Sequence, residues 1–192
     1  MGRLPADAHW ALPLSLFLLA APAAASSRFA DLAGHASIGY AKLAIPEAPA
    51  GSISMAAGLD IPVARSLRAG FELGYDLLGS RTVERGSLTG SVDYSAFQLT
   101  AFAHWLPGLG PLQRVSVGPA MVNAHGDLSV TGGGAGFSDL AVGSTGFAVA
   151  GQITLMPPRP APVRLGLELG GRKAFLPGQD WNLFSVRLTV HY

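Results

Sequence analysis

The run NLFSVRLTVHY, from Asn182 to Tyr192, restricts the fold of this chain more than any other stretch. Counting back in twos from the final Tyr192 gives an unbroken apolar series, and polar residues occupy the positions between. Because successive side chains of a β-strand point to opposite faces, the run predicts a strand with one apolar and one polar face. The apolar series consists of Phe184, Val186, Leu188, Val190 and Tyr192.

The same two-faced alternation recurs along the rest of the chain. The further predicted strands are residues 36–43, 52–63, 68–77, 92–106, 114–123, 145–155 and 163–172. With the terminal run they make eight strands. The links after the second, fourth and sixth strands are short, those after the third and fifth are long and polar, and the remaining two are short. We therefore predict an all-β fold, an eight-stranded antiparallel up-and-down transmembrane β-barrel, because short turns at one end and long loops at the other are typical of such barrels. Both chain termini are expected at the short-turn end.

Besides the short loop of residues 46–51, three segments between the predicted strands are expected to be loops. They are residues 79–90, 124–144 and 176–181, and the longest of them is also compatible with an extension of its two flanking strands. Two residues disturb the alternation within strands. Lys42 falls on the apolar face, so it is expected at a rim or at a bulge. Pro119 cannot donate to a strand ladder, and a bulge is predicted there.

The N-terminus has the features of a secretory signal peptide. Arg3 supplies a positive charge, residues 11–22 supply an apolar core, and Ala23 to Ala25 offer small residues for cleavage. The apolar core is shorter than the ~20 residues that a membrane-spanning helix needs, which disfavours an anchor. We expect residues 1–25 to be a signal peptide and residues 26–192 to be one barrel domain.

Alternation alone does not decide whether the apolar face points outward to lipid or inward, as in soluble ligand-binding barrels. Charged residues make up 13% of the chain, against roughly 25% in soluble proteins. The face opposite the apolar series is mostly Gly, Ala, Ser and Thr, which are too small and too weakly charged to cover a soluble surface. These residues suit a narrow lumen filled by side chains. The apolar face is therefore predicted to meet lipid.

A small set of charged residues lies on the face assigned to the lumen. Enclosed charges need partners, so we expect ion pairs among them, with Glu168 and Arg187 on neighbouring strands as the preferred pair. The alternative is a set of solvated surface charges. The predicted lumen network consists of Asp60, Glu72, Asp76, Arg164, Glu168, Arg172 and Arg187.

Strand length and aromatic placement agree with a membrane-spanning barrel. A strand of about eleven residues at ~3.3 Å each, tilted by ~45°, rises roughly 26 Å, close to the ~25 Å apolar band of such barrels. Aromatic girdles belong near strand ends, although ordinary cross-strand packing would also place aromatic residues there. The candidate girdle residues are Tyr40, Tyr75, Trp105 and Tyr192.

A leader ending in AAASS, eight alternating strands and the final NLFSVRLTVHY resemble the small outer-membrane β-barrel proteins of the OmpA/OmpX/OmpW-like group. The resemblance covers nearly the whole chain after the leader and rests on pattern. It implies a location in the cell outer membrane, contact with lipid and lipopolysaccharide, and insertion by the barrel-assembly machinery. In that family the terminal strand is the assembly signal, which Phe184, Val186, Leu188, Val190 and Tyr192 match, although the family more often ends in phenylalanine.

Catalytic chemistry has weak support in the sequence. His125, Asp127 and Ser129 alternate and would share one face of a strand, as the residue types of a hydrolytic triad, but a polar loop supplies such residues by chance. His104 and His191 are expected as hydrogen-bonded interior residues. There is no cysteine, and the net charge of +1 gives no nucleic-acid footprint. We expect no enzyme activity and no cofactor.

The sequence therefore favours a monomeric structural or surface-interaction barrel with a narrow, side-chain-filled lumen. A small pore or a transporter of apolar small molecules is the alternative, and a lipid-modifying outer-membrane enzyme is a third hypothesis.

Overall fold

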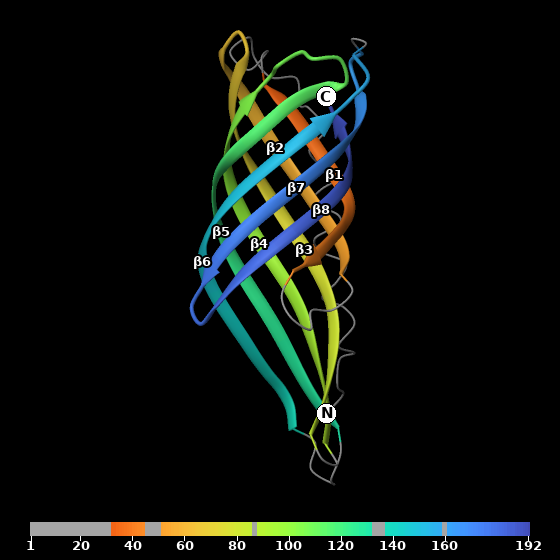
Figure 1. Ribbon diagram of the computed structural model, residues 1–192, viewed down its shortest axis with the longest axis vertical. Helices are drawn as coiled ribbons and strands as arrows, with labels where there is room; N and C mark the ends of the chain where they lie inside the picture. The colour runs from red at the N-terminus through yellow and green to blue at the C-terminus, as the bar shows by residue number, and fades with distance from the viewer. Residues whose placement is uncertain (1–31, 45–50, 86–87, 132–136, 159–160) are drawn as a thin grey trace, which may run out of the picture.

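The computed structural model describes residues 32–44, 51–85, 88–131, 137–158 and 161–192, and the predicted signal peptide lies outside this set. Eight antiparallel strands form one closed barrel in chain order, as predicted (Figure 1). The strands are β1 (Ala33–Leu43), β2 (Ser52–Ala64), β3 (Leu67–Arg85), β4 (Leu88–Trp105), β5 (Leu112–Thr131), β6 (Phe137–Leu155), β7 (Arg164–Leu176) and β8 (Gln179–His191). Among the described residues, no helix is long and apolar enough to cross a membrane.

The barrel closes where β1 pairs with β8. The register runs from His35 opposite His191 to Leu43 opposite Leu183. Beyond the last strand residue, the backbones of Gly34 and Tyr192 exchange two hydrogen bonds of 2.9 and 3.0 Å. Closure matters physically, because it leaves the barrel wall without an unpaired strand edge.

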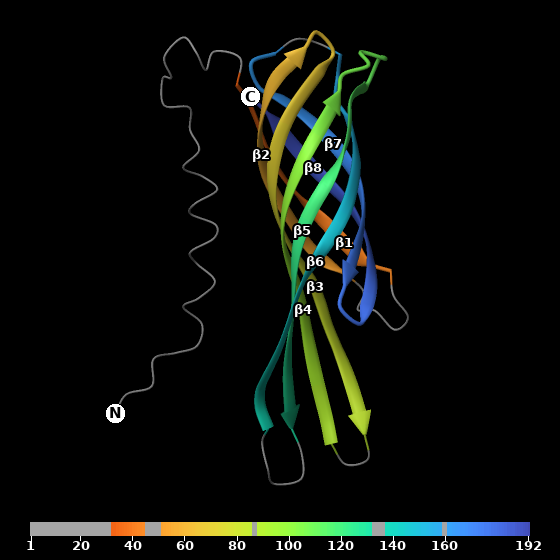
Figure 2. The same cartoon turned by 90° about the vertical axis from the view of Figure 1, so that its left-hand side faces the viewer.

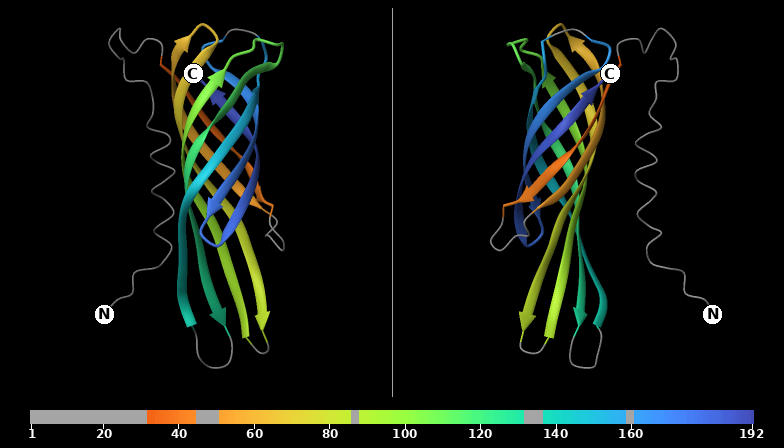
Figure 3. Two further views of the ribbon diagram at one scale, coloured as in Figure 1. Left: turned by 60° about the vertical axis from the view of Figure 1, so that its left-hand side comes forward. Right: turned by 90° about the vertical axis from the view of Figure 1, so that its right-hand side faces the viewer.

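The two ends of the barrel differ. At one end, which we call the turn end, lie Tyr192, the start of β1 and the links that join β2 to β3, β4 to β5 and β6 to β7 (Figure 2). At the opposite end β3, β4, β5 and β6 continue well past the other four strands, so we call it the extended end (Figure 3). The start of the first strand and the end of the last one thus share the turn end, in agreement with the sequence prediction.

The extension corrects two predicted loops. The sequence predicts a loop at residues 79–90, yet β3 runs to Arg85 and β4 begins at Leu88. In the predicted loop 124–144, β5 runs to Thr131 and β6 begins at Phe137, which confirms the alternative of extended strands. These segments are polar and glycine-rich, but two strands already in register can continue their ladder without an apolar face. Polarity is therefore a poor guide to where pairing stops.

The third predicted loop, residues 176–181, is also wrong. β7 ends at Leu176 and β8 begins at Gln179, so only Pro177 and Gly178 turn the chain. Gly178 has a φ of 89°, a left-handed conformation that glycine adopts without steric cost. Trp181, which falls in the predicted loop, is buried in the lumen.

The bulge predicted at Pro119 is wrong, because Pro119 pairs with Val149 in unbroken register. For Lys42 the structure confirms the rim and not the bulge: it pairs regularly with Phe184, is exposed and lies one residue before the end of β1. A register shift instead separates Leu77 and Gly79 on β3. Gly79 has a φ of 86°, as a glycine in a bulge commonly does. The bulge lies where β3 leaves the barrel wall.

Large apolar side chains face outward on every strand, as the alternation predicted, and along most of the barrel small or polar side chains face the lumen; large apolar side chains such as Leu43, Leu78 and Trp181 are buried toward the extended end. One exposed example from each strand in order is Ile38, Ile53, Phe71, Leu99, Val117, Phe147, Leu165 and Leu188. One buried polar counterpart from each strand is Ser37, Ser54, Glu72, Thr100, Ser116, Gln152, Glu168 and Thr189.

Candidate functional site

The lumen contains buried charged and polar side chains, which are arranged in layers along the barrel. A layer around Asp60 lies toward the turn end, a layer around Arg187 lies in the middle, and a layer around Asp76 lies toward the extended end. Beyond Asp76 the lumen is apolar. Neighbouring strands supply each layer because inward positions recur every second residue and the register aligns them.

The central layer is an ion-pair cluster around Arg187. Its Nε donates to Glu168 Oε1 at 2.7 Å, and its Nη2 donates to Glu72 Oε1 at 3.1 Å. All three side chains are buried, with exposed fractions of 1% or less. The register places Glu168 directly opposite Arg187. The structure thus brings together the pair preferred from the sequence and adds Glu72 from across the lumen.

His35 and Gln152 complete the central layer. His35 Nε2 lies 3.0 Å from Glu72 Oε2, and Gln152 Nε2 donates to the same oxygen at 3.3 Å. Gly58 makes room for the imidazole, because a Cβ at this glycine would lie 2.4 Å from His35 Cε1. The sequence pattern does not assign His35, because the predicted first strand begins one residue after it.

The same layer offers the one group of potential metal ligands found among the described residues. Ligand atoms of His35, Glu72 and Glu168 all lie within 4.8 Å of one another. Both carboxylates already accept hydrogen bonds from Arg187. The guanidinium therefore supplies the positive charge that a cation would otherwise bring.

Toward the extended end, Asp76 accepts hydrogen bonds from two partners. Arg172 Nη1 donates to Asp76 Oδ2 at 3.3 Å and Gln98 Nε2 donates to it at 2.7 Å. Beyond this layer, toward the extended end, the buried side chains are apolar and include a Tyr94–Trp181 edge contact with ring centroids 6.2 Å apart. The buried apolar cluster consists of Ala41, Leu43, Leu78, Ala96, Ala120, Val122, Ala124, Ala148, Ala174, Leu176, Trp181 and Leu183.

Toward the turn end, Asp60 forms ion pairs with Arg68 and Arg114. The Arg68 contact is close, and Arg114 Nη1 lies 3.5 Å from Asp60 Oδ1. His104 lies in this region and shares a 2.8 Å hydrogen bond with Ser116 Oγ. His191 lies 3.2 Å from Thr189 Oγ1 and 3.5 Å from Arg114 Nη2. Both histidines are buried and hydrogen-bonded, in the positions expected from the sequence.

Sequence reasoning missed Arg68 and Arg114. Both stand at the first residues of predicted strands, where the alternation has no preceding residue to fix the face. Both residues are an even number of positions from inward residues of the same strands, Glu72 on β3 and Ser116 on β5. Counting in twos along each strand would therefore have placed both arginines in the lumen.

The predicted network member Arg164 makes no hydrogen bond or ion pair within the described part of the chain, and it lies at the turn end rather than in the central layers.

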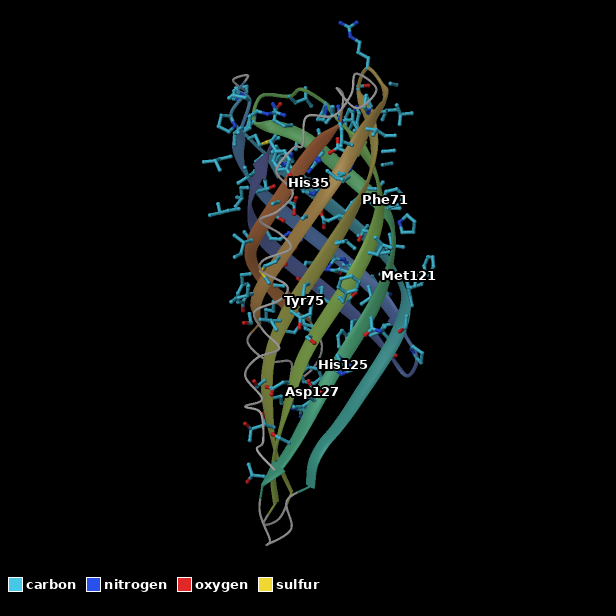
Figure 4. All side chains as sticks on the ribbon, turned by 180° about the vertical axis from the view of Figure 1, so that it is seen from behind. His35, Phe71, Tyr75, Met121, His125 and Asp127 are labelled. Carbon is cyan, nitrogen blue, oxygen red and sulfur yellow. The ribbon has the colours of Figure 1, made fainter. Side chains whose placement is uncertain are left out.

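The candidate triad residues lie outside the lumen. His125, Asp127 and Ser129 share the outward face of β5, and all three are exposed. His125 Nε2 lies 3.7 Å from Asp127 Oδ1, and Figure 4 places both nearer the extended end than His35. The predicted common face is thus present. No cavity or contact described in the structure joins Ser129 to the other two.

The residues of the predicted assembly signal form one outward row along β8 and its end. Phe184, Val186 and Leu188 are exposed by 58%, 48% and 67%. Tyr192 follows at the turn end, where its ring covers Gly34 of β1. Tyr40 and Trp105 are also exposed near strand ends, whereas Tyr75 lies well inside the lengthened β3 (Figure 4).

The sequence matches no protein-family model and no curated protein at a significant level. Solved structures are similar in fold. A major outer membrane protein from Thermus thermophilus matches with a TM-score of 0.61 and 13% identity over 84% of this chain and 97% of that chain. Neisserial surface protein A matches with a TM-score of 0.54 and 13% identity, over 84% of this chain and 96% of that one.

The attachment invasion locus protein Ail of Yersinia pestis, in complex with the heparin analogue sucrose octasulfate, also matches. Its TM-score is 0.55 at 13% identity, over 84% of this chain and 99% of that chain. At such identities the likeness concerns the fold. This chain therefore has the fold of the small eight-stranded β-barrels known from bacterial outer membranes.

Proposed function

We propose that the protein spans the bacterial outer membrane as a closed barrel and presents its extended end to the exterior as an interaction surface. The observation that carries the proposal is the outer face, where each of the eight strands exposes large apolar side chains. At ~25 cal/mol per Å² of apolar area, a row such as Phe184, Val186 and Leu188 would be costly to leave in water and is stabilised by lipid. A closed barrel also leaves no open strand edge in the wall, as the membrane interior requires.

The extended end supports the interaction role. Pairing of β2 with β3 stops at Ser54 opposite Asp76, but β3 stays paired with β4 to Arg85. Pairing of β6 with β7 starts at Phe147, although β6 pairs with β5 from Phe137 onward. The four-stranded extension therefore has two strand edges that neither neighbouring barrel strand covers. Such edges can accept an added strand from a partner.

The fold comparison is consistent with a surface role. Ail is named as an attachment invasion locus protein and was solved with a heparin analogue. For the present chain, the partners we propose are outer-membrane lipid and lipopolysaccharide around the barrel and the barrel-assembly machinery during insertion. We expect a monomer, because the apolar outer face would be covered by lipid.

Orientation can be tested by cysteine labelling, since the chain has no cysteine of its own. Thr82→Cys is exposed at the extended end, and Ser66→Cys is an exposed matched site in the turn between β2 and β3. A maleimide that cannot cross the outer membrane should label Thr82→Cys on intact cells, and should label Ser66→Cys only after permeabilisation. The reverse pattern would contradict the proposed orientation.

A closed lumen distinguishes this proposal from a pore. The buried Arg187 cluster and the apolar cluster around Trp181 lie in series along the barrel. We expect no discrete channels in planar bilayers. Stepwise conductance by the purified protein would favour the small-pore alternative.

The proposed role includes no catalysis. His125 and Ser129 are exposed on the outer face of β5, where nothing described excludes water from them. His125→Ala and Ser129→Ala should leave the mass spectrum of lipid A unchanged in cells that express each variant. A lipid A species that disappears with either substitution would support the lipid-modifying hypothesis.

A further inference from the structure

A cavity opens at the turn end of the barrel, beyond the layer of Asp60. Its volume is about 320 Å³, which lies at the lower end of the range for small-molecule pockets. The ends of β1 and of the chain contribute Ala33 and Tyr192, and the turns contribute residues such as Gly108 and Pro162. We call this cavity the mouth pocket. The two proposed roles, contact of the outer face with lipid and interaction at the extended end, do not involve the mouth pocket.

The lining of the mouth pocket is rich in cationic side chains. Arg68, Arg114 and Arg164 all line it, and Asp60 is the acidic side chain among the lining residues. The positive charges outnumber the negative ones even when the carboxylate at Tyr192 is counted. Three guanidinium groups from β3, β5 and β7 thus surround one small space. This arrangement favours an anion.

Arg114 is the strongest reason to infer a ligand. Its side chain is only 3% exposed, and its Nε has no hydrogen-bond partner. Its contacts with Asp60 and His191 are both 3.5 Å long, beyond the usual range of about 2.7–3.2 Å. A buried charged donor without a good acceptor is costly, so an acceptor in the cavity would stabilise it.

Arg164 supplies a second available cation. It is half-buried as the first residue of β7 and forms no ion pair within the residues that the structure describes. Guanidinium groups present paired donors that match the geometry of carboxylate and phosphate oxygens. Gln113, on the same lining, carries a further amide.

We propose that the mouth pocket binds a small oxyanion, a phosphate or carboxylate group held by Arg114 and Arg164. Leu106 and Met156 contribute apolar side chains to the lining, so the preferred ligand carries its anionic group on a small apolar body. Two sources share this chemistry: a free small molecule that enters from the turn end, and the phosphate of a lipid headgroup at the rim.

The test uses the purified, folded protein with two probes, inorganic phosphate and succinate. Binding is followed by calorimetry and by the phosphate ³¹P resonance. The decisive variant is Arg164→Gln, and its matched control is Lys173→Gln. The control removes the same charge from the same strand, but Lys173 is 54% exposed and lies toward the extended end. Arg114→Gln is a second variant, whose fold is checked by its gel migration before and after boiling.

Saturable binding that weakens roughly tenfold in Arg164→Gln, and is unchanged in Lys173→Gln, would support the proposal. A tenfold loss of affinity is about 1.4 kcal/mol, near the lower end of what one hydrogen bond to a charged group contributes. Repeating the titration in bilayer discs separates the sources. Binding that persists in discs with anionic lipid indicates a soluble ligand, and competition by anionic but not zwitterionic lipid indicates a headgroup. No saturable binding in the millimolar range, or equal binding by wild type and Arg164→Gln, would overturn the proposal.

Discussion

Removing Arg187 should destabilise the barrel more than removing any exposed charge. Arg187→Met keeps most of the side-chain volume, but it leaves Glu72 and Glu168 buried and facing each other without the cation that joins them. Breaking a buried ion pair by removing one partner costs about 3–5 kcal/mol. Here one guanidinium serves two carboxylates, so we expect the upper part of that range at neutral pH.

The loss can be measured by urea unfolding of the protein in lipid vesicles. Tryptophan fluorescence reports unfolding, because Trp181 is buried beside Tyr94 and becomes exposed, and a Trp105→Phe background removes the signal of the already exposed Trp105. Lys173→Met is the matched control, because Lys173 and its partner Asp180 are both 54% exposed and 3.9 Å apart. An exposed pair of this kind contributes about 0–1 kcal/mol.

A triple variant separates charge from packing. Combining Arg187→Met with Glu72→Gln and Glu168→Gln removes all three charges, so most of the stability lost in the single variant should return. A loss below about 1 kcal/mol for Arg187→Met alone would refute the argument that uncompensated buried charge dominates this layer. A triple variant as unstable as the single one would show instead that side-chain packing is the cause.

Three further outcomes are expected. Leu188→Arg, at a position 67% exposed beside the central layer, should cost ~2–4 kcal/mol in vesicle unfolding if that face meets lipid, and a loss near zero would argue for water. Gly39→Ala should lower the unfolding midpoint clearly, because the new Cβ would lie 2.0 Å from the Val186 carbonyl oxygen at the β1–β8 seam; an unchanged midpoint would show that the seam can relax. Deleting Tyr192 should slow assembly in cells more than it lowers the stability of the purified barrel, and equal effects on both would contradict its role as an assembly signal.

The barrel wall was predictable because its alternation has a simple physical cause. A wall between lipid and a narrow lumen imposes opposite chemistry on successive residues, and this pattern appears in every strand from Ile38 to Leu188. The extended end was not predictable in the same way. In the extended end, beyond the part of the barrel that is closed by all eight strands, both faces of β3 and β5 can be polar. Polar residues there, such as Ser80 and Asp127, are as compatible with a strand as with a loop.

The lumen was predictable in composition and only partly in geometry. Register gave the neighbouring pair Glu168 and Arg187, since adjacent strands lie side by side. The contact of Arg187 with Glu72 crosses the lumen between β8 and β3, and alternation contains no information about which residues meet across it. That contact depends on barrel shear and strand tilt, which the sequence pattern does not specify.

The most direct test of the account is where the protein is found and how it migrates. After cell fractionation we expect recovery in the outer membrane, with faster migration on cold detergent gels than after boiling, because a closed barrel resists cold detergent. The matched loading control is the same sample, boiled. Recovery in the soluble periplasm with a single gel position before and after boiling would contradict the claim that the apolar outer face of this barrel meets lipid.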